Sequence, residues 1–202
     1  MAQNNYDYAL KILVIGDNYV GKTSLIQRFS DDIFIENYCS SIGIYFKIKI
    51  IEIDDKLIKV QVWDPCIGND RFRNLRTSFY RGTLGIIITY DITDKQNFID
   101  LRKWIDEILR KAALETRIIL VGNKCDLSNE RKVTEEEGKK LTDEFGMLFF
   151  ETSAKTGYNV NFAFETLIED IIKHCKKLEE RKITLKKDNK KSINDKKNRC
   201  PK

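Results

Sequence analysis

The stretch Gly16-Asp17-Asn18-Tyr19-Val20-Gly21-Lys22-Thr23 decides the fold of this chain. It matches the pattern G-x-x-x-x-G-K-[ST], a loop whose backbone N–H groups cradle a polyphosphate. The apolar run Leu10–Ile15 before it predicts a buried strand, and residues 24–29 after it predict the first turns of a helix. Glycines that only form a turn are the alternative, but strand and helix flank the loop in the order that an anion site requires.

Two side chains of this loop carry chemistry. Lys22 supplies a cation for the outer phosphates, and the Thr23 hydroxyl can be a ligand of Mg²⁺. Further contacts to the bound molecule are predicted for Asn18, Val20, Gly21 and Ser24.

Length and composition predict one globular domain. The chain has 202 residues and no run of about 18 apolar residues, so no transmembrane helix is expected. The N-terminus does not read as a signal peptide, and Ala2 stands where myristoylation would need glycine. The five cysteines are scattered without a C-x-x-C pair, which favours a reducing compartment and disfavours a zinc site or a disulfide framework.

The positive charge is concentrated at the C-terminal end. Residues 176–202 hold 12 Lys and Arg against 4 Asp and Glu, a net charge of +8, which leaves −3 of the chain's +5 for the rest. Nucleic-acid binding is therefore not expected. We predict a folded domain over residues 1–180 and a basic tail over 181–202, disordered from residue 183 onward.

Six apolar runs predict strands that alternate with segments of helical periodicity, which favours an α/β fold with a mostly parallel sheet and helices on both faces. One strand should be antiparallel, because only Asp54-Asp55-Lys56 separates the second run from the third. Ligands of such sheets bind beyond the C-terminal ends of the strands. The runs are Leu10–Ile15, Phe46–Ile53, Leu57–Trp63, Gly85–Tyr90, Ile118–Val121 and Leu148–Phe150.

A second motif, Asn123-Lys124-Cys125-Asp126, follows the fifth run. The Asp126 carboxylate can accept hydrogen bonds from N1–H and the 2-amino group of guanine, whereas adenine would leave it buried and unpaired. Asn123 can tie this loop to the phosphate loop, and the stem of Lys124 can lie along the base. Ser153, Ala154 and Lys155 follow the last run and can close over the guanine O6. The motif is weak alone, but together the loops predict a site for GTP or GDP and disfavour an ATPase or kinase.

From about Tyr8 to Lys177 the chain resembles the Ras-superfamily small GTPases, and among them the Rab proteins. The resemblance rests on these loops and on further segments: Ile42–Lys47, Lys59–Trp63, Arg71–Arg73, Phe79–Gly82 and Thr89–Thr93. It implies a three-layer P-loop fold with a six-stranded sheet and about five helices, and a monomeric GTPase switch in vesicle traffic that uses Mg²⁺. It also implies effectors, an exchange factor, an activating protein and a GDI or escort protein.

The resemblance assigns roles to residues of the two switch segments. Phe34 should pack against the guanine, Tyr38 should cap the phosphates, and Asp64 and Ser41 should join Thr23 around Mg²⁺. Effector-facing positions are Ile44, Phe46, Trp63 and Phe79, of which the three aromatic residues correspond to a triad that reports the nucleotide state. The alternative for the triad is core packing.

The chain departs from the Rab pattern where hydrolysis takes place. Ser41 replaces a threonine, which keeps the oxygen and loses a stiffening methyl group. Asn18 and Tyr19 are larger than usual in the phosphate loop. One extra residue lies between Asp64 and Gly68, the glycine whose N–H should meet the γ-phosphate, and Pro65 restricts the backbone nearby.

Asn69 stands where a glutamine should orient the attacking water, and it is one methylene shorter. Because misplacement by about 1 Å can cost ~10²-fold in rate, we expect slow intrinsic hydrolysis by the catalytic set of Lys22, Gly68 and Asn69. The rival hypothesis is a nucleotide-holding scaffold that hydrolyses little or no GTP.

The C-terminal tail predicts a peripheral location on the cytosolic face of endomembranes. Cys200 lies near the end and outside a C-a-a-X box, and the resemblance makes it a candidate for prenylation. A single lipid chain anchors weakly, and the basic tail supplies a second signal toward an acidic leaflet. The alternative is a solvated tail with a free thiol.

Overall fold

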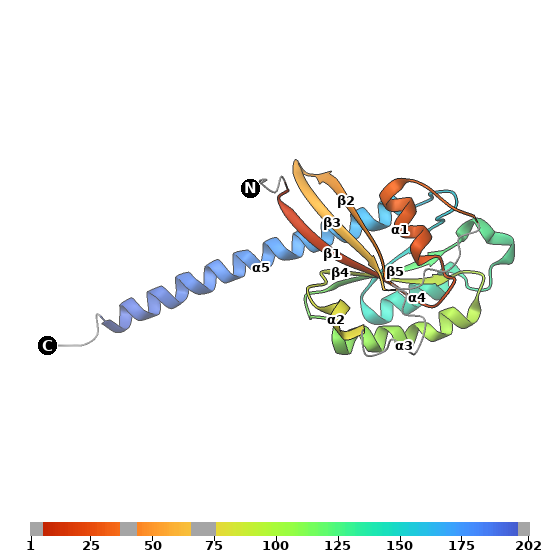
Figure 1. Cartoon of the computed structure of the whole chain (residues 1–202). Helices are drawn as coiled ribbons and strands as arrows, with labels where there is room; N and C mark the ends of the chain where they lie inside the picture. The colour runs from red at the N-terminus through yellow and green to blue at the C-terminus, as the bar shows by residue number, and fades with distance from the viewer. Residues whose placement is uncertain (1–5, 37–43, 66–75, 198–202) are drawn as a thin grey trace.

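The computed structural model describes residues 6–36, 44–65 and 76–197, with side chains described throughout except at 76–77 and 179–197. Strands and helices alternate along the chain (Figure 1). Their bounds are β1 Tyr8–Ile15, α1 Lys22–Asp31, β2 Tyr45–Ile53, β3 Lys56–Asp64, α2 Arg76–Tyr80, β4 Gly85–Asp91, α3 Lys95–Lys111, β5 Arg117–Asn123, the 3₁₀ helix η2 Cys125–Glu130, α4 Glu135–Phe145, β6 Leu148–Glu151 and α5 Val160–Lys197.

The strands form one six-stranded sheet in the order β2-β3-β1-β4-β5-β6. Only β2 runs antiparallel to its neighbour, and all other pairs are parallel. The predicted fold class, the six strands and the hairpin are therefore confirmed. Parallel pairing of β1, β3, β4, β5 and β6 brings their C-terminal ends to one edge of the sheet, where the predicted nucleotide loops begin.

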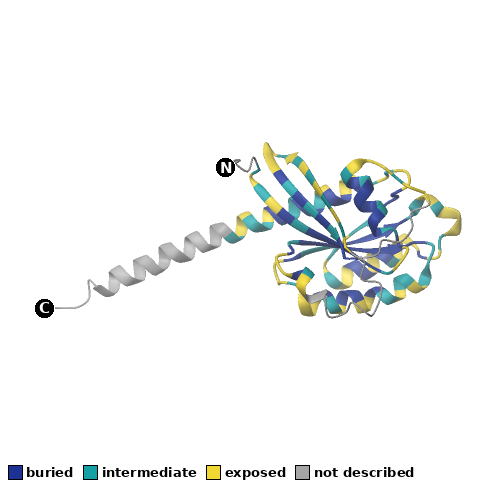
Figure 2. Ribbon diagram, in the orientation of Figure 1, coloured by how far each residue is buried: buried dark blue, intermediate teal, exposed yellow. Residues whose placement is uncertain are grey.

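Helices cover both faces of the sheet, and the sheet separates the core into two clusters (Figure 2). On one face α1 and α5 pack together, and the rings of Phe29 and Phe164 stack with their centroids 4.1 Å apart. On the other face the apolar stripe of α3 and the inner side of α4 pack on the sheet, with Trp104, Ile108 and Leu141 in that cluster. The α/β pattern of the sequence thus produces three layers.

The C-terminal segment differs from the prediction. We expected disorder from residue 183, but α5 continues as a helix to Lys197 and projects beyond the sheet (Figure 1). Lys, Glu and Leu have high helix propensity, and no glycine or proline interrupts residues 160–197, so the local sequence permits this continuation. The domain boundary at residue 180 stays a prediction from the sequence.

Candidate nucleotide-binding site

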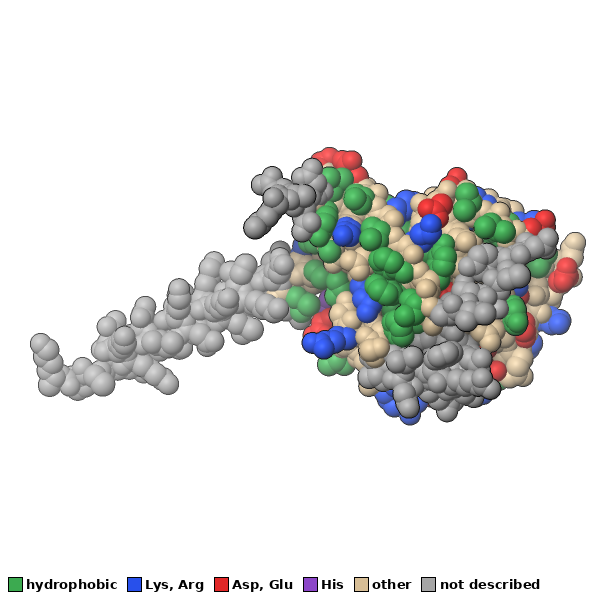
Figure 3. Space-filling view, in the orientation of Figure 1, with side chains coloured by type: hydrophobic (Ala, Val, Ile, Leu, Met, Phe, Trp, Pro, Cys, Tyr) green, Lys and Arg blue, Asp and Glu red, His purple; other side chains and the backbone are tan. Residues whose placement is uncertain are grey.

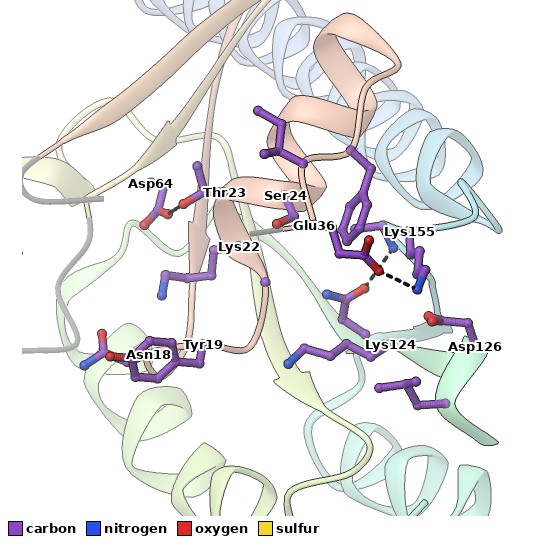
Figure 4. Close-up of a pocket in the computed structure, with 16 residues that line it drawn as sticks. Asn18, Tyr19, Lys22, Thr23, Ser24, Glu36, Asp64, Lys124, Asp126 and Lys155 are labelled. Atoms are coloured by element: carbon purple, nitrogen blue, oxygen red, sulfur yellow. Dashed lines mark hydrogen bonds and ion pairs between the residues drawn. The ribbon is translucent and has the colours of Figure 1, made fainter. Parts of the chain in front are cut away.

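A cavity of about 390 Å³ opens at the C-terminal edge of the sheet. Phosphate-loop residues line one side, and Lys124, Asp126 and Lys155 line the other (Figure 4). Most predicted contacts that the structure describes lie in this wall, from segments far apart in the chain. They are Asn18, Gly21, Lys22, Thr23, Ser24, Phe34, Asp64, Asn123, Lys124, Asp126, Ala154 and Lys155.

Two predicted contacts lie behind the wall rather than in it. The side chain of Val20 is fully buried, and its carbonyl accepts a hydrogen bond of 2.8 Å from Asn123 Nδ2. The Ser153 side chain is fully buried as well, and its hydroxyl donates to Asp126 Oδ1 at 2.6 Å. The sequence pattern predicts the loop correctly. Which of its side chains face the cavity depends on the tertiary structure of the loop.

Glycines shape the phosphate loop. Gly21 is the N-cap of α1 at φ 92°, and a Cβ there would lie 2.4 Å from Asn123 Nδ2. Gly16 has φ 144°, and a Cβ there would lie 2.1 Å from the carbonyl oxygen of Thr89. Because Gly21 has no side chain to cap the helix, the first N–H groups of α1 can be satisfied by an anion.

The two charged side chains of the phosphate side, Lys22 and Asp64, are buried. Lys22 is 7% exposed, and its ammonium donates to the carbonyl of Asp17 at 2.8 Å. The Thr23 hydroxyl donates to Asp64 Oδ2 at 2.7 Å, and Asp64 is 1% exposed. This hydroxyl and carboxylate are the hard oxygen donors that Mg²⁺ prefers, so the two residues fit the ion.

The rest of a magnesium shell must come from elsewhere. Among the side chains that the structure describes, no group of three or more His, Cys, Asp and Glu is placed to hold a metal ion. Mg²⁺ commonly keeps several waters and binds through one or two protein oxygens together with substrate phosphates. Thr23 and Asp64 therefore fit an ion that arrives with the nucleotide.

The base side is held by a hydrogen-bond network around Asn123, which is 1% exposed. Its Oδ1 accepts from the Ala154 N–H at 3.2 Å and from the Thr152 hydroxyl at 3.3 Å. Its Nδ2 donates to the phosphate loop, as described above. One amide thus joins the three loops that form the cavity, which confirms in geometry the tie expected between the Asn123 loop and the phosphate loop.

Two partners in the site were missed by sequence reasoning. Asp91, at the end of β4, pairs with the Lys124 ammonium at 2.6 Å and is only 6% exposed. Arg28 on α1 donates to the carbonyls of Ala154 and Lys155 at 2.9 and 3.0 Å. In the sequence, the only feature that points to Asp91 is its position directly after the fourth apolar run. No feature of the sequence points to Arg28.

Several predicted residues lie outside the described part of the chain. These are Tyr38 and Ser41 of the first switch segment, Gly68 and Asn69 of the second, and the lipidation candidate Cys200. The insertion was predicted between Asp64 and Gly68, and of the residues between these two only Pro65 is described. Their roles stay predictions from the sequence.

The positions predicted to face effectors are Ile44 directly before β2, Phe46 on β2, Trp63 on β3 and Phe79 on α2. Ile44 and Phe46 are 56% and 38% exposed, and the Phe46 ring lies 4.3 Å from that of Trp63. Figure 3 shows hydrophobic side chains gathered on this face with basic side chains between them. Trp63 and Phe79 also pack partly on the core, so exposure and core packing coexist.

Lys11 on β1 joins two members of this face. Its ammonium donates to the carbonyl of Phe79 at 2.7 Å and lies 5.6 Å from the centre of the Trp63 ring. Burial lowers the pKa of Lys11. Sequence reasoning counted it only as part of a buried strand.

Comparison with known proteins identifies the family. A sequence model of the Ras family matches residues 11–173. The chain is 47% identical over 173 residues to GTP-binding protein ypt2 of Schizosaccharomyces pombe, which covers 86% of each protein. It is 48% identical over 175 residues to Ras-related protein Rab-8A of Bos taurus, covering 86% of this chain and 84% of the relative. It is 49% identical over 166 residues to Ras-related protein RIC1 of Oryza sativa subsp. japonica, covering 82% of each.

The fold, the composite nucleotide cavity and these matches place the chain in a class, the P-loop small GTPases. It belongs to the Ras family and, within it, to the Rab group. Among the residues that the structure describes, no helix combines the length and the apolar character needed to span a bilayer.

Proposed function

We propose that this Rab-type GTPase binds GTP and GDP in the cavity between the phosphate loop and the Asn123–Asp126 loop. The observation that carries the proposal is the network around Asn123. It joins the phosphate-binding and base-binding loops, which lie over 100 residues apart in the chain, into one wall. A site that joins an anion cradle to a guanine-reading carboxylate favours a guanine nucleotide over other phosphorylated ligands.

Each predicted group has a chemical role in that site. Lys22 and the first N–H groups of α1 would neutralise the outer phosphates. Thr23 and Asp64 would hold Mg²⁺, which when bound offsets phosphate charge, and Ser41 would add an oxygen in the GTP state. Asp126 would accept both guanine donors and is held ready by the Ser153 hydroxyl.

The cycle of this switch would be read by partners at the membrane. Effectors, an exchange factor, an activating protein and a GDI or escort protein would engage the switch segments and the face formed by Ile44, Phe46, Trp63 and Phe79. The basic C-terminal segment and a prenylated Cys200 would hold the protein on the cytosolic face of an endomembrane. The protein would act as a monomer, without nucleic acid.

Hydrolysis of GTP would be slow without an activating protein, because Asn69 is short and an extra residue precedes Gly68. The relatives give no support to the scaffold hypothesis. Single-turnover hydrolysis of GTP on the purified protein with Mg²⁺ tests the point. A rate below that of a Rab protein with glutamine in this position is expected, and an equal rate would contradict the role given to Asn69.

The base preference is tested with GTP and inosine triphosphate, which lacks only the 2-amino group of guanine. Wild type should prefer GTP, because Asp126 would accept from both N1–H and the 2-amino group. Asp126→Ala should weaken GTP binding by ~10²-fold or more and bind the two nucleotides equally. Titration with fluorescent nucleotides measures both affinities. An Asp126→Ala variant that keeps the preference for GTP would refute the proposed base site.

A further inference from the structure

The phosphate loop carries a negative charge beside the site for an anion. Asp17 directly follows the first glycine of the loop, and its carboxylate would repel a polyphosphate if it turned toward the cavity. The cavity wall includes Asn18 and Tyr19, but Asp17 is not part of it. Something must hold this carboxylate away from the phosphates.

The side chains that donate hydrogen bonds to this carboxylate come from α3, which lies on the opposite face of the sheet from α1. Trp104 Nε1 donates to Asp17 Oδ1 at 2.9 Å, and Asn97 Nδ2 donates to Asp17 Oδ2 at 3.5 Å. The two donors are seven residues apart in α3, two turns along the same face. The Trp104 side chain is more than nine-tenths buried in the core of that layer, so its N–H is a fixed point rather than a flexible surface group.

We infer that Trp104 is a positioning residue for nucleotide binding: with Asn97 it holds the Asp17 carboxylate on the α3 side of the loop and out of the phosphate cradle. The backbone carbonyl of Asp17 accepts a hydrogen bond of 2.8 Å from the Lys22 ammonium. Asp17 therefore links the loop to the sheet's second layer through its side chain and to the phosphate-binding lysine through its backbone. This inference deepens the proposed function and rests on it.

The inference makes a charge-specific prediction. In Trp104→Phe the ring still fills the core, but the carboxylate loses its main donor and can approach the phosphates. Release of GTP should become about tenfold faster, the effect of one lost hydrogen bond to a charged group. Release of GDP should rise less, because GDP carries less negative charge than GTP.

Removing the charge should then repair the defect. Asp17→Asn combined with Trp104→Phe should release GTP within about threefold of wild type, since a neutral amide does not repel phosphate. Stopped-flow displacement of fluorescent GTP and GDP analogues measures the rates, and thermal unfolding checks that each variant is folded. Asp106→Asn removes an exposed carboxylate from the same helix and serves as the matched control, with release unchanged.

Each outcome is decisive. A double variant that releases GTP as fast as Trp104→Phe alone would show that the indole only packs, and equal acceleration of GTP and GDP would show the same. If Trp104→Phe does not fold, Asn97→Ala with and without Asp17→Asn makes the same comparison. If wild type itself fails to bind GTP, the proposed function falls together with this inference, whereas unchanged release in the variants overturns the inference alone.

Discussion

At the scale of single residues, the cavity depends on positions where almost no atom can be added. Gly21 is the sharpest case, because it has a positive φ and faces the Asn123 amide that joins the loops. A side chain there would strain the backbone. It would also displace Asn123 and break its hydrogen bond to the Val20 carbonyl. Backbone strain of this kind costs about 1–3 kcal/mol, apart from the clash.

Gly21→Ala should therefore lose nucleotide binding while the domain still folds. We expect GTP affinity to fall by at least ~10²-fold, since the loop and its tie to Asn123 move together. Titration with a fluorescent nucleotide and urea unfolding measure the two effects. Gly146→Ala is the control, because Gly146 also has a positive φ of 64° but nothing lies within 4 Å of an added Cβ. It should lose stability and keep affinity, and a similar loss of affinity in both variants would contradict the role of Gly21.

At the scale of elements, the β2–β3 hairpin shows how a turn sets a register. Asp54 and Asp55 form its two-residue loop with φ of 51° and 58°, and Ile53 pairs with Lys56 across it. Type I′ turns require positive φ at both central positions, and glycine meets this requirement best. Two aspartates adopt the turn because the long, regular pairing of the strands holds them there.

Asp55→Gly should relieve this strain and raise the free energy of unfolding by about 0.5–1 kcal/mol. Urea unfolding with saturating GDP measures the change. Asp55→Ala is the opposite control, because alanine tolerates the left-handed region less well than aspartate, so stability should fall. A glycine variant no more stable than wild type would mean that the turn carries no strain.

At the scale of the whole molecule, charge divides the protein into two parts. Residues 176–202 carry +8 while the remainder carries −3, so the C-terminal segment of the chain is strongly basic. An anionic leaflet attracts each nearby Lys or Arg by about 1 kcal/mol. The acidic remainder has no comparable attraction, which favours approach to a membrane by the C-terminal end.

The full chain should therefore bind vesicles that contain phosphatidylserine and should not bind vesicles of phosphatidylcholine alone. Binding should weaken steeply with added salt. A chain that ends at residue 180 should lose most of this binding and retain its affinity for GTP. Vesicle sedimentation measures the bound fraction. Equal binding by the shortened chain would assign the membrane contact to the folded domain instead.

Local sequence predicted most of the elements because their signals are local. Each apolar run became a strand, and the runs were correct to within one or two residues. Strand ends were less accurate: β1 begins at Tyr8 rather than Leu10, and Ala9, although exposed, still pairs with Lys59 of β3. The five-residue helix α2 was not predicted, because so short a segment shows no clear periodicity.

What the sequence by itself determined is the class of protein and the chemistry of its site. The two loop motifs each consist of a few neighbouring residues in a fixed order, so the phosphate loop and the guanine contact proposed for Asp126 could be predicted without coordinates. Only the tertiary structure decided which partners complete the site. Trp104 meets Asp17 across 87 positions, and Asp91 meets Lys124 across the ends of two strands. Such pairs arise from the packing of layers, and no local pattern records that packing.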